Sequence, residues 1–153
     1  MKIITQNKKA FHDYDILDKI EVGIVLTGDE VKSLRAELAN LTGAYATVHE
    51  GELFLINCHI TPYDKAFRKD EDAAKRSRKL LLHKKEITRL VGDISKKGIT
   101  IVPLKLYFNE KGRIKVELGI AKHKKAAGKK LALKEKDIKR EAQREIRGRY
   151  KYK

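Results

Sequence analysis

The sequence predicts a mainly β fold: a small, closed, antiparallel OB-like barrel of about six strands, with two or three short helices and a basic C-terminal tail. Five or six short segments show period-two hydrophobicity, too few for a sandwich of two sheets, and closing them into a barrel hides their edges. The 153 residues are 41% hydrophobic, enough for one core. The net charge of +15 is concentrated near the C-terminus, which separates a folded body from a tail.

The first predicted strand leads directly into a helix. Ile20–Leu26 carries an aliphatic residue at every second position, the pattern of a strand with one buried face. Thr27 precedes Glu30 by three residues, the spacing of a capping box in which each side chain binds the other's backbone amide. The expected core face of the helix is Val31, Leu34 and Leu38, with Lys32, Ser33 and Arg35 off that face and Asn40 as its stop.

A hairpin and a charged segment follow this helix. Strands at Ala44–His49 and Glu52–Ile60 flank a turn at Glu50 and Gly51. In residues 64–77, nine of 14 are charged and of mixed sign, so we expect a mobile surface loop there.

A second helix and two strong strands complete the body. The helix covers Lys84–Lys97, and Gly98 suits a left-handed cap after it. The strands Thr100–Phe108 and Arg113–Ala121 are joined by a four-residue hairpin turn. The residues expected on the buried faces are Ile87, Leu90, Val91 and Ile94 of the helix, Val102, Leu104, Leu106 and Phe108 of the first strand, and Ile114, Val116, Leu118 and Ile120 of the second.

The distribution of charge divides the chain at residue 121. Residues 1–121 hold 22 Lys and Arg against 17 Asp and Glu, whereas residues 122–153 hold 14 against 4, a net +10. From Leu131 to Arg147 there is no Gly or Pro, and one thin apolar stripe recurs every four residues. We expect residues 122–153 to be disordered when free and helical against a polyanion. A helix docked on the barrel is the alternative.

The sequence contains no strong signature of an enzyme, a bound metal or a cofactor. The five histidines form neither HxH nor HExxH, and the nucleotide-binding and nucleophile-elbow motifs are absent. Cys58 is the only cysteine and is expected in the core. Asp13 and Asp15 could hold a magnesium ion as in a nuclease, although two surface carboxylates are the more common case.

Nothing in the sequence predicts a membrane protein. The longest aliphatic run near the middle of the chain is Leu80–Leu82, and the first 18 residues hold no apolar signal segment. We expect a soluble protein of a reducing compartment.

Several basic clusters favour nucleic acid as the partner. They are Lys8 and Lys9, Lys32 with Arg35, Arg76 to Lys79, and Lys122 to Lys130. Phe11, His12 and Tyr14 follow the first cluster, and rings beside cations can stack on unpaired bases.

Long motifs resemble the small protein B family, the tmRNA-binding proteins of bacterial trans-translation. The matching segments are Asn7–Ala10, His12–Tyr14, Gly23–Arg35, Asn40–Leu41, Tyr45, Phe54–Leu55, His59–Tyr63, Arg78–Lys84 and Val102–Phe108. The likeness extends from Asn7 to about Glu141.

This resemblance implies an OB-like barrel that binds the tRNA-like domain of tmRNA in place of a missing anticodon arm. It also implies a tail that enters the empty mRNA channel at the small-subunit decoding centre, so that stalled ribosomes are rescued and the nascent chain is tagged. Elongation factor Tu would share the delivery complex, in the cytoplasm.

The family motifs assign roles residue by residue. The positions expected to bind tmRNA are Asn7, Lys8, Lys9, His12, Glu30, Lys32, Ser33, Arg35, Lys124 and Lys125. Two roles are open for Glu30: accepting hydrogen bonds from a base edge, or capping its helix through Thr27. The positions expected to contact the ribosome are Lys129, Lys130, Lys134, Asp137, Ile138, Lys139 and Arg140.

The tail departs from the family pattern at three positions. Ala127 replaces an aromatic or imidazole group, Gly128 replaces an aspartate, and Ile138 stands where an aromatic residue is common. These changes put base stacking at Ala127 in doubt, whereas the lysines keep the expected phosphate contacts.

Two other hypotheses remain beside the tmRNA partner. A ribosomal or general structured-RNA-binding protein would have the same composition. A metal-dependent nuclease would rest on Asp13 and Asp15 alone.

Overall fold

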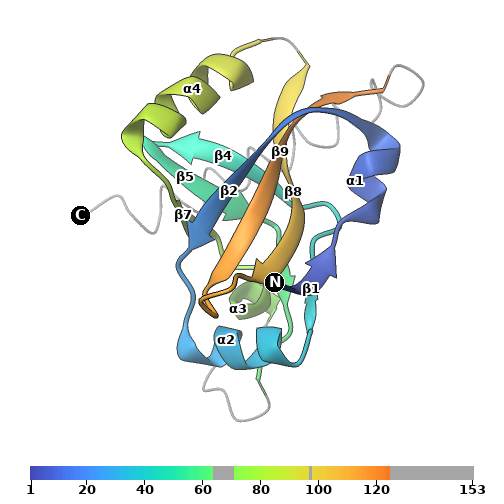
Figure 1. Cartoon of the computed structure of the whole chain (residues 1–153), viewed down its shortest axis with the longest axis vertical. Coiled ribbons are helices and arrows are strands. Elements are labelled where there is room, and N and C mark those ends of the chain that lie inside the picture. Colours follow the sequence, from blue (N-terminus) through green and yellow to red (C-terminus); the bar gives the residue numbers. More distant parts are fainter. Residues whose placement is uncertain (64–70, 97, 125–153) are drawn as a thin grey trace.

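The computed structural model describes residues 1–63, 71–96 and 98–124. Six strands close into a ring in the order β8-β4-β5-β7-β2-β9 and back to β8, and β1 pairs with the last part of β8, residues 105–108 (Figure 1). All pairings are antiparallel. The predicted closed barrel of about six strands is confirmed.

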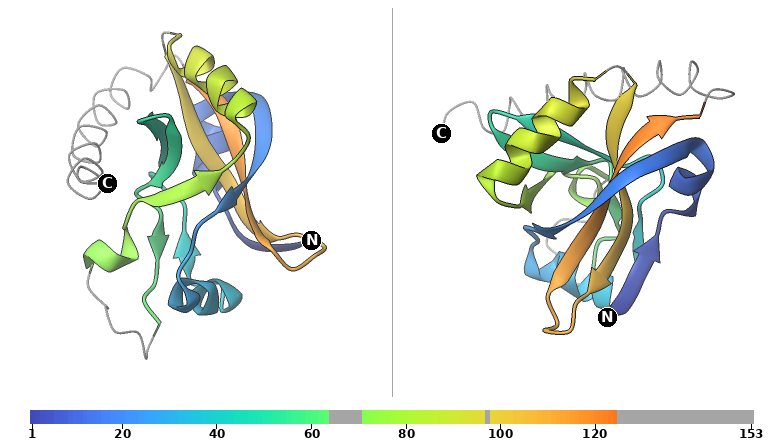
Figure 2. Two further views of the ribbon diagram at one scale, coloured as in Figure 1. Left: turned by 90° about the vertical axis from the view of Figure 1, so that its left-hand side faces the viewer. Right: turned by 45° about the horizontal axis from the view of Figure 1, so that its top comes forward.

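The strands are β1 (Lys2–Gln6), β2 (Tyr14–Ile24), β3 (Ala39–Asn40), β4 (Tyr45–His49), β5 (Glu52–Ile56), β6 (His59–Ile60), β7 (Arg78–Leu81), β8 (Ile99–Phe108) and β9 (Ile114–His123). The helices are α1 (Lys8–Asp13), α2 (Gly28–Arg35), α3 (Glu71–Ala74) and α4 (Lys84–Ile94). β3 pairs with β6 in a separate two-stranded ribbon. Helix α4 packs across one end of the barrel and α2 lies at the other (Figures 1 and 2).

The strand β2 is longer than predicted, because it begins at Tyr14 rather than Ile20. A bulge between Ile16 and Asp18 interrupts its pairing with β9, and Leu17 at the bulge is 58% exposed. A bulge shifts the alternation of side chains by one residue, so the first half of β2 lacks a continuous period-two pattern. Its partner β9 runs to His123, two residues beyond the predicted boundary of the barrel.

A second bulge, between Pro103 and Lys105 of β8, changes which face each side chain occupies. Ile101 and Leu106 lie in the main core, whereas Val102 and Leu104 join a smaller cluster on the outside of the barrel with Ala10 of α1. The prediction that Val102, Leu104 and Leu106 share one face was therefore wrong. Both faces of β8 are buried because α1 covers the outer one.

The capping box of α2 is confirmed, but the predicted faces of the helix are wrong in part. The helix ends at Arg35, and Glu37 adopts the left-handed region with φ of 61°. Leu38 N–H donates to the Ser33 carbonyl and Glu37 N–H to the Leu34 carbonyl, which together form a Schellman motif. Because the chain turns there, Leu38 leaves the helix and is 45% exposed, whereas Ser33, expected outside, is 1% exposed.

The predicted hairpins are confirmed, with one difference. Glu50 and Gly51 have φ of 51° and 77°, the backbone of a type I′ turn that matches the twist of β4 and β5. The second strand is interrupted at Asn57, also left-handed with φ of 61°, so that β5 and β6 replace one strand. Between β8 and β9, the Asn109 side chain accepts hydrogen bonds from the Lys111 and Arg113 amides.

The remaining segments differ more from prediction. In the charged segment 64–77, residues 64–70 lie outside the described part, and the rest forms α3 and leads into β7, which was not predicted. In α4 Leu90 is buried as expected, but Val91 is 46% exposed. None of the helices in the described part of the chain is long and apolar enough to cross a lipid bilayer.

The packing of Leu104 over β9 makes Gly119 a sensitive position. A Cβ atom at Gly119 would lie 3.0, 3.1 and 3.2 Å from three carbon atoms of the Leu104 side chain. We therefore expect Gly119→Val to lower the free energy of unfolding by about 1–3 kcal/mol through overpacking. Urea unfolding followed by circular dichroism measures this change.

Gly92 of α4 is the matched control. Its position is open, because a Cβ atom added there would meet no other atom within 4 Å. Gly92→Ala is expected to stabilise the protein by roughly 0.4–1 kcal/mol, because alanine restricts the unfolded chain and suits a helix. Equal effects of the two substitutions would contradict the packing argument.

Candidate nucleic-acid interface

The predicted RNA-binding residues fall into two groups on different parts of the barrel. Lys8, Lys9 and His12 lie on α1, while Lys32 and Arg35 lie on α2, and all five residues are exposed. Figure 1 shows α1 beside the start of β2, and α2 beyond the other end of β2. The structure thus presents two separate basic surfaces, which we call the α1 surface and the α2 surface.

Asn7 holds α1 in place rather than forming part of the exposed surface. Its side-chain oxygen accepts a hydrogen bond from Ala10 N–H (3.2 Å), which caps the helix. Its side-chain nitrogen donates to the carbonyl oxygens of Pro103 (2.9 Å) and Leu41 (3.4 Å). With 5% of its area exposed and its amide occupied at both ends, Asn7 fixes α1 against β8.

Lys124 joins the α1 surface from the far end of the barrel sequence. Its backbone N–H donates to the Asp13 carbonyl (3.1 Å), and its Nζ donates to the Phe11 carbonyl (3.1 Å). Phe11 itself is 47% exposed, and Lys19 Nζ lies 5.8 Å from its ring centroid. A ring accessible to solvent and flanked by cations suits contact with an unpaired base and its phosphates.

On the α2 surface, Lys32 and Ser33 differ in their exposure to solvent although they are neighbours in the chain. Lys32 is exposed, and its Nζ lies 4.9 Å from the centroid of the Tyr63 ring. Ser33 is buried, and its hydroxyl has no hydrogen-bond partner among the described residues. The expectation of an outward-facing Ser33 is therefore corrected: Lys32 and Arg35 form the accessible basic part of this helix.

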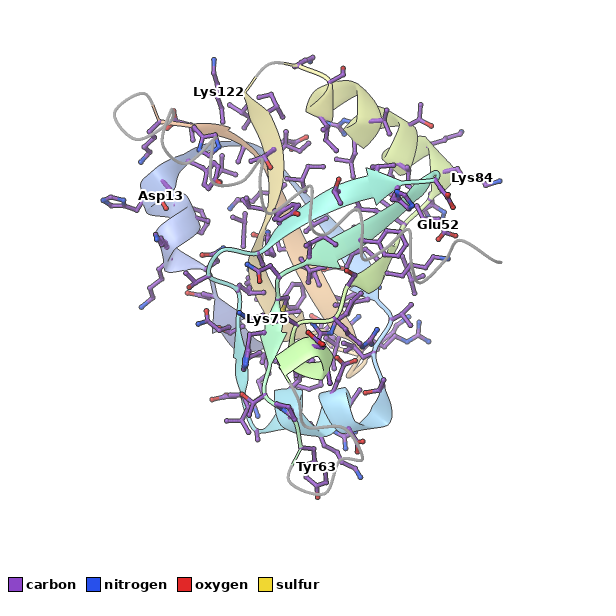
Figure 3. The ribbon with its side chains drawn as sticks, turned by 180° about the vertical axis from the view of Figure 1, so that it is seen from behind. Asp13, Glu52, Tyr63, Lys75, Lys84 and Lys122 are labelled. Atoms are coloured by element: carbon purple, nitrogen blue, oxygen red, sulfur yellow. The ribbon has the colours of Figure 1, made fainter. Side chains whose placement is uncertain are left out.

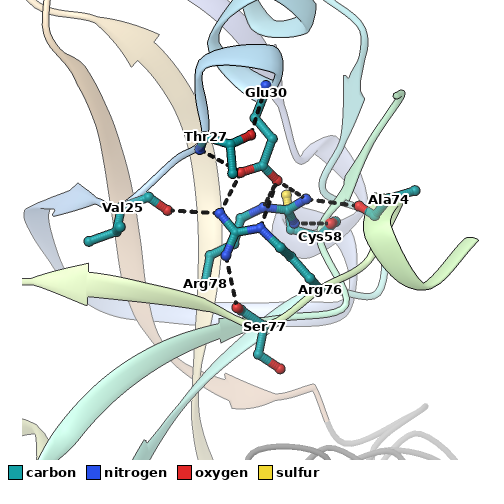
Figure 4. A network of polar contacts seen from close by, with 8 residues as sticks. All are labelled: Val25, Thr27, Glu30, Cys58, Ala74, Arg76, Ser77 and Arg78. Carbon is teal, nitrogen blue, oxygen red and sulfur yellow. Dashed lines mark hydrogen bonds and ion pairs between the residues drawn. The ribbon is translucent and has the colours of Figure 1, made fainter. Parts of the chain in front are cut away.

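Glu30 lies at the centre of a buried polar cluster (Figure 4). Its carboxylate accepts hydrogen bonds from the Thr27 amide (2.9 Å), from Arg76 Nη2 (2.5 Å) and Nε (3.2 Å), and from Arg78 Nε (2.6 Å). We call Glu30, Arg76 and Arg78 the Glu30 cluster. The capping role of Glu30 is thus present in the structure, and only 9% of the residue is exposed.

Both arginines belong to the basic cluster from Arg76 to Lys79 that was predicted to favour nucleic acid, and Arg78 is not available for such contact. Arg78 is completely buried and also donates to the carbonyls of Cys58 (2.6 Å) and Ala74 (2.9 Å). In an extended segment, side chains two positions apart point to the same side. This spacing could have suggested that Arg76 and Arg78 share one binding partner. Their acidic partner lies more than 40 positions away, so local spacing gives no indication of it.

The electrostatics of the cluster keep Glu30 ionised. Burial alone raises the pKa of this carboxyl, but the hydrogen bond from Arg76, the charge of Arg78 and the Thr27 amide lower it further than burial raises it. The net result is a pKa below its usual value. Both guanidinium groups therefore face a negative charge at neutral pH.

The nuclease hypothesis gains no support from the geometry. In residues 1–63, 71–96 and 98–124 there is no group of three or more His, Cys, Asp or Glu side chains placed to hold a metal ion. Asp13 contacts His12 Nδ1 at 3.2 Å, and Asp15 is exposed. Cys58 is in the core as predicted, and burial raises the pKa of its thiol to about 11.

The other predicted contact residues are not placed. Those that lie outside the described residues are Lys125, Lys129, Lys130, Lys134, Asp137, Ile138, Lys139 and Arg140.

The lowered pKa of Glu30 predicts how stability depends on pH. A carboxyl whose pKa is lower in the folded state stabilises the fold above its unfolded pKa, and this contribution disappears as the pH falls through the folded value. We expect Glu30→Gln to lower the free energy of unfolding at pH 7, by up to about 3–5 kcal/mol. The deficit should shrink as the pH is lowered below 4.5, the ordinary value of the group.

Urea titrations of wild type and variant at several pH values measure this difference. Glu52→Gln is the matched control, since Glu52 pairs with Lys79 (3.0 Å) at an exposed position. That exposed pair is expected to contribute less than about 1 kcal/mol. A deficit of Glu30→Gln that stays constant down to pH values well below 4.5 would contradict the assigned ionisation.

With this geometry described, comparison with known proteins identifies close relatives. The model of the SmpB protein family matches residues 4–148. The SsrA-binding protein of Symbiobacterium thermophilum is 51% identical over 147 residues, which cover 96% of this chain and 92% of that protein. The SsrA-binding protein of Geobacter metallireducens is 52% identical over 150 residues, covering 98% of this chain and 97% of that protein.

A solved structure extends the likeness to three dimensions. One chain of the structure described as "tmRNA-SmpB: a journey to the center of the bacterial ribosome" matches with a TM-score of 0.67 and 49% sequence identity. The match covers 90% of this chain and 92% of that one. Because the family model and these relatives match almost the whole length, the chain belongs to the SmpB protein family.

Proposed function

We propose that this protein binds SsrA RNA (tmRNA) and delivers it to stalled ribosomes in trans-translation. The observation that carries the proposal is the identity of about half of all residues with SsrA-binding proteins over nearly the full chain. The structural relative belongs to a complex described as tmRNA-SmpB at the center of the bacterial ribosome. The proposal assigns no catalytic step to the chain: it acts as an RNA-binding protein.

The α1 surface supports binding of a folded RNA. Lys8, Lys9, His12 and Lys124 come from both ends of the barrel sequence, and the fold collects them around one helix. In the described residues, no ion pair is found for Lys8 or Lys9, so their charges are available to phosphate groups. Phosphates bound by lysine release counterions, which supplies affinity. The exposed ring of Phe11 adds a surface on which an unpaired base can stack.

Beyond Lys124 and Lys125, which are expected to bind SsrA RNA, the C-terminal tail is proposed to contact the ribosome. With 14 Lys and Arg against 4 Asp and Glu in residues 122–153, it suits the electronegative path of mRNA through the small subunit. We propose that the tail enters the empty mRNA channel at the decoding centre and becomes helical there. Its contacts would come from Lys129, Lys130, Lys134, Asp137, Ile138, Lys139 and Arg140.

Two finer parts of the proposal follow from the delivery role. Elongation factor Tu would accompany the RNA and the protein to the ribosome, and the site of action would be the cytoplasm, where ribosomes translate.

A ribosomal or general structured-RNA-binding protein remains the second candidate, because the charge distribution alone suits any folded RNA.

Selective retention of SsrA RNA tests the proposal against this second candidate. We expect immobilised protein to retain SsrA RNA from a bacterial extract at moderate salt while bulk tRNA passes through, measured by hybridisation to both RNAs. Retention of both in proportion to their abundance would support general structured-RNA binding.

The salt dependence of binding tests the electrostatic argument for the barrel alone. About four phosphate contacts predict that the logarithm of the RNA affinity falls against the logarithm of the salt concentration with a slope of about −3 to −4, and a slope near zero would contradict that argument.

Removal of the tail tests the division of roles. We expect a chain ending at Lys130 to retain the affinity of the full chain for the tRNA-like domain of SsrA RNA but to lose tagging of nascent chains on stalled ribosomes. The RNA affinity of the truncated chain is the internal control, since it shows that the barrel is folded. Persistent tagging would contradict the role of the tail.

A further inference from the structure

The Glu30 cluster connects the barrel to the α2 surface, and this connection has a consequence for RNA binding. We propose that Arg76 and Arg78 are positioning residues: they hold Glu30, and through it α2, so that Lys32 and Arg35 face the RNA in one orientation. Neither arginine needs to touch the RNA itself. This inference rests on the proposed function and adds two residues to it.

Helix α2 depends on few anchors. Of its eight residues, only Glu30, Ser33 and Leu34 are buried. Leu34 packs in the main core, whereas the Ser33 hydroxyl makes no hydrogen bond within the described part of the chain. The polar contacts from buried side chains of α2 to the rest of the barrel therefore come from Glu30. The orientation of a helix this short follows the geometry of the groups that hold it.

Arg78 joins three elements at one point. Its Nε donates to Glu30 of α2, its Nη1 to the Cys58 carbonyl before β6, and its Nη2 to the Ala74 carbonyl at the end of α3. A guanidinium group is planar and rigid, so these contacts set both the distance and the angle between the elements. Lysine at this position could not reproduce the three directions.

Arg76 completes the clamp at the edge of the cluster. Its Nη2 and Nε bind the two oxygens of the Glu30 carboxylate, and Nη2 also approaches the Val25 carbonyl (3.4 Å) just after β2. Figure 4 shows both guanidinium groups against the Glu30 carboxylate. Although 24% of the Arg76 side chain is exposed, its strongest donors are already occupied by a carboxylate. We therefore infer that Arg76 holds α2 in place rather than binding a phosphate.

A double-mutant cycle separates positioning from direct contact. Arg76→Gln keeps hydrogen-bonding groups and leaves Glu30 paired with Arg78, so the variant is expected to fold. We expect it to bind the tRNA-like domain of SsrA RNA about tenfold more weakly, with an unchanged salt slope because no phosphate contact is lost. Direct contact with a phosphate would instead reduce the slope by about 0.7–0.9.

The cycle also shows through which surface Arg76 acts. We expect Lys32→Ala to weaken binding less in the Arg76→Gln background than in wild type, because Lys32 is no longer held in its orientation. Lys8→Ala, on the α1 surface, should have the same effect in both backgrounds. Equal, additive effects at Lys32 and Lys8 would overturn the proposal, since general destabilisation does not distinguish the two surfaces.

Arg89→Gln provides the matched control for lost charge. Arg89 of α4 is exposed and pairs with Asp18, so its substitution removes the same charge and breaks an arginine–carboxylate pair away from α2. We expect an RNA affinity within about twofold of wild type. A loss in Arg89→Gln equal to that in Arg76→Gln would overturn the positioning role, because net charge would then explain both.

A second variant tests the positioning role at the other arginine of the cluster. Arg78→Lys keeps the buried charge but not the three directed hydrogen bonds, and it should show the same selective coupling to Lys32. Thermal unfolding followed by circular dichroism confirms that each variant is folded at the binding temperature. If the wild-type protein itself fails to bind the RNA, the proposed function fails; if it binds and Arg76→Gln binds equally well, only the positioning role fails.

Discussion

The barrel depends on the backbone pairing of β8, which hydrogen-bonds to β9 along most of its length, to β4 at Ala46, and to β1 at its far end. No other strand of the described sheet has three partners. β8 has three partners because β9 pairs along one of its edges, while β4 at Ile101 and β1 at residues 105–108 pair with different stretches of the other edge. The bulge in β8 changes which face its side chains occupy, so that β8 contributes to two different clusters. The inner cluster is the core of the barrel, and the outer one, with Leu104 over Gly119, supports α1. Figure 3 shows the same barrel from behind, with its side chains drawn.

The two basic surfaces are joined to this barrel by different kinds of interaction. On the α1 side, the neutral amide of Asn7 reaches the Pro103 carbonyl of β8, and Ala10 packs into the outer cluster. On the α2 side, the link is the ionic Glu30 cluster. Taking a carboxylate and a guanidinium out of water is costly, so such a cluster is stable only when its hydrogen bonds are satisfied. The carboxylate of Glu30 meets this condition, with donors on both oxygens.

Part of the fold was predictable because the signals are local. Thr27 and Glu30 form the capping box that their spacing predicted, and Glu50-Gly51 forms the turn expected between two strands. β1, α1 and β7 were missed, and β2 and β8 were misread in part. In β2 and β8 the reason is the same: a bulge inserts one residue, so a face cannot be followed by counting in twos. The four-residue strand β7 is too short to show a period at all.

The sequence by itself determined the composition of the candidate site: basic residues beside rings near residues 8–14, a charged helix after Thr27, and a tail with two thirds of the excess charge. Only the tertiary structure decided which of these residues are accessible. It placed Lys124 against α1, buried Asn7 and Ser33, and turned Arg78 into the interior. The physical reason is that exposure and ion pairing depend on contacts between residues far apart in the chain. Glu30 and Arg78 are 48 positions apart, and no local pattern can reveal such a pair.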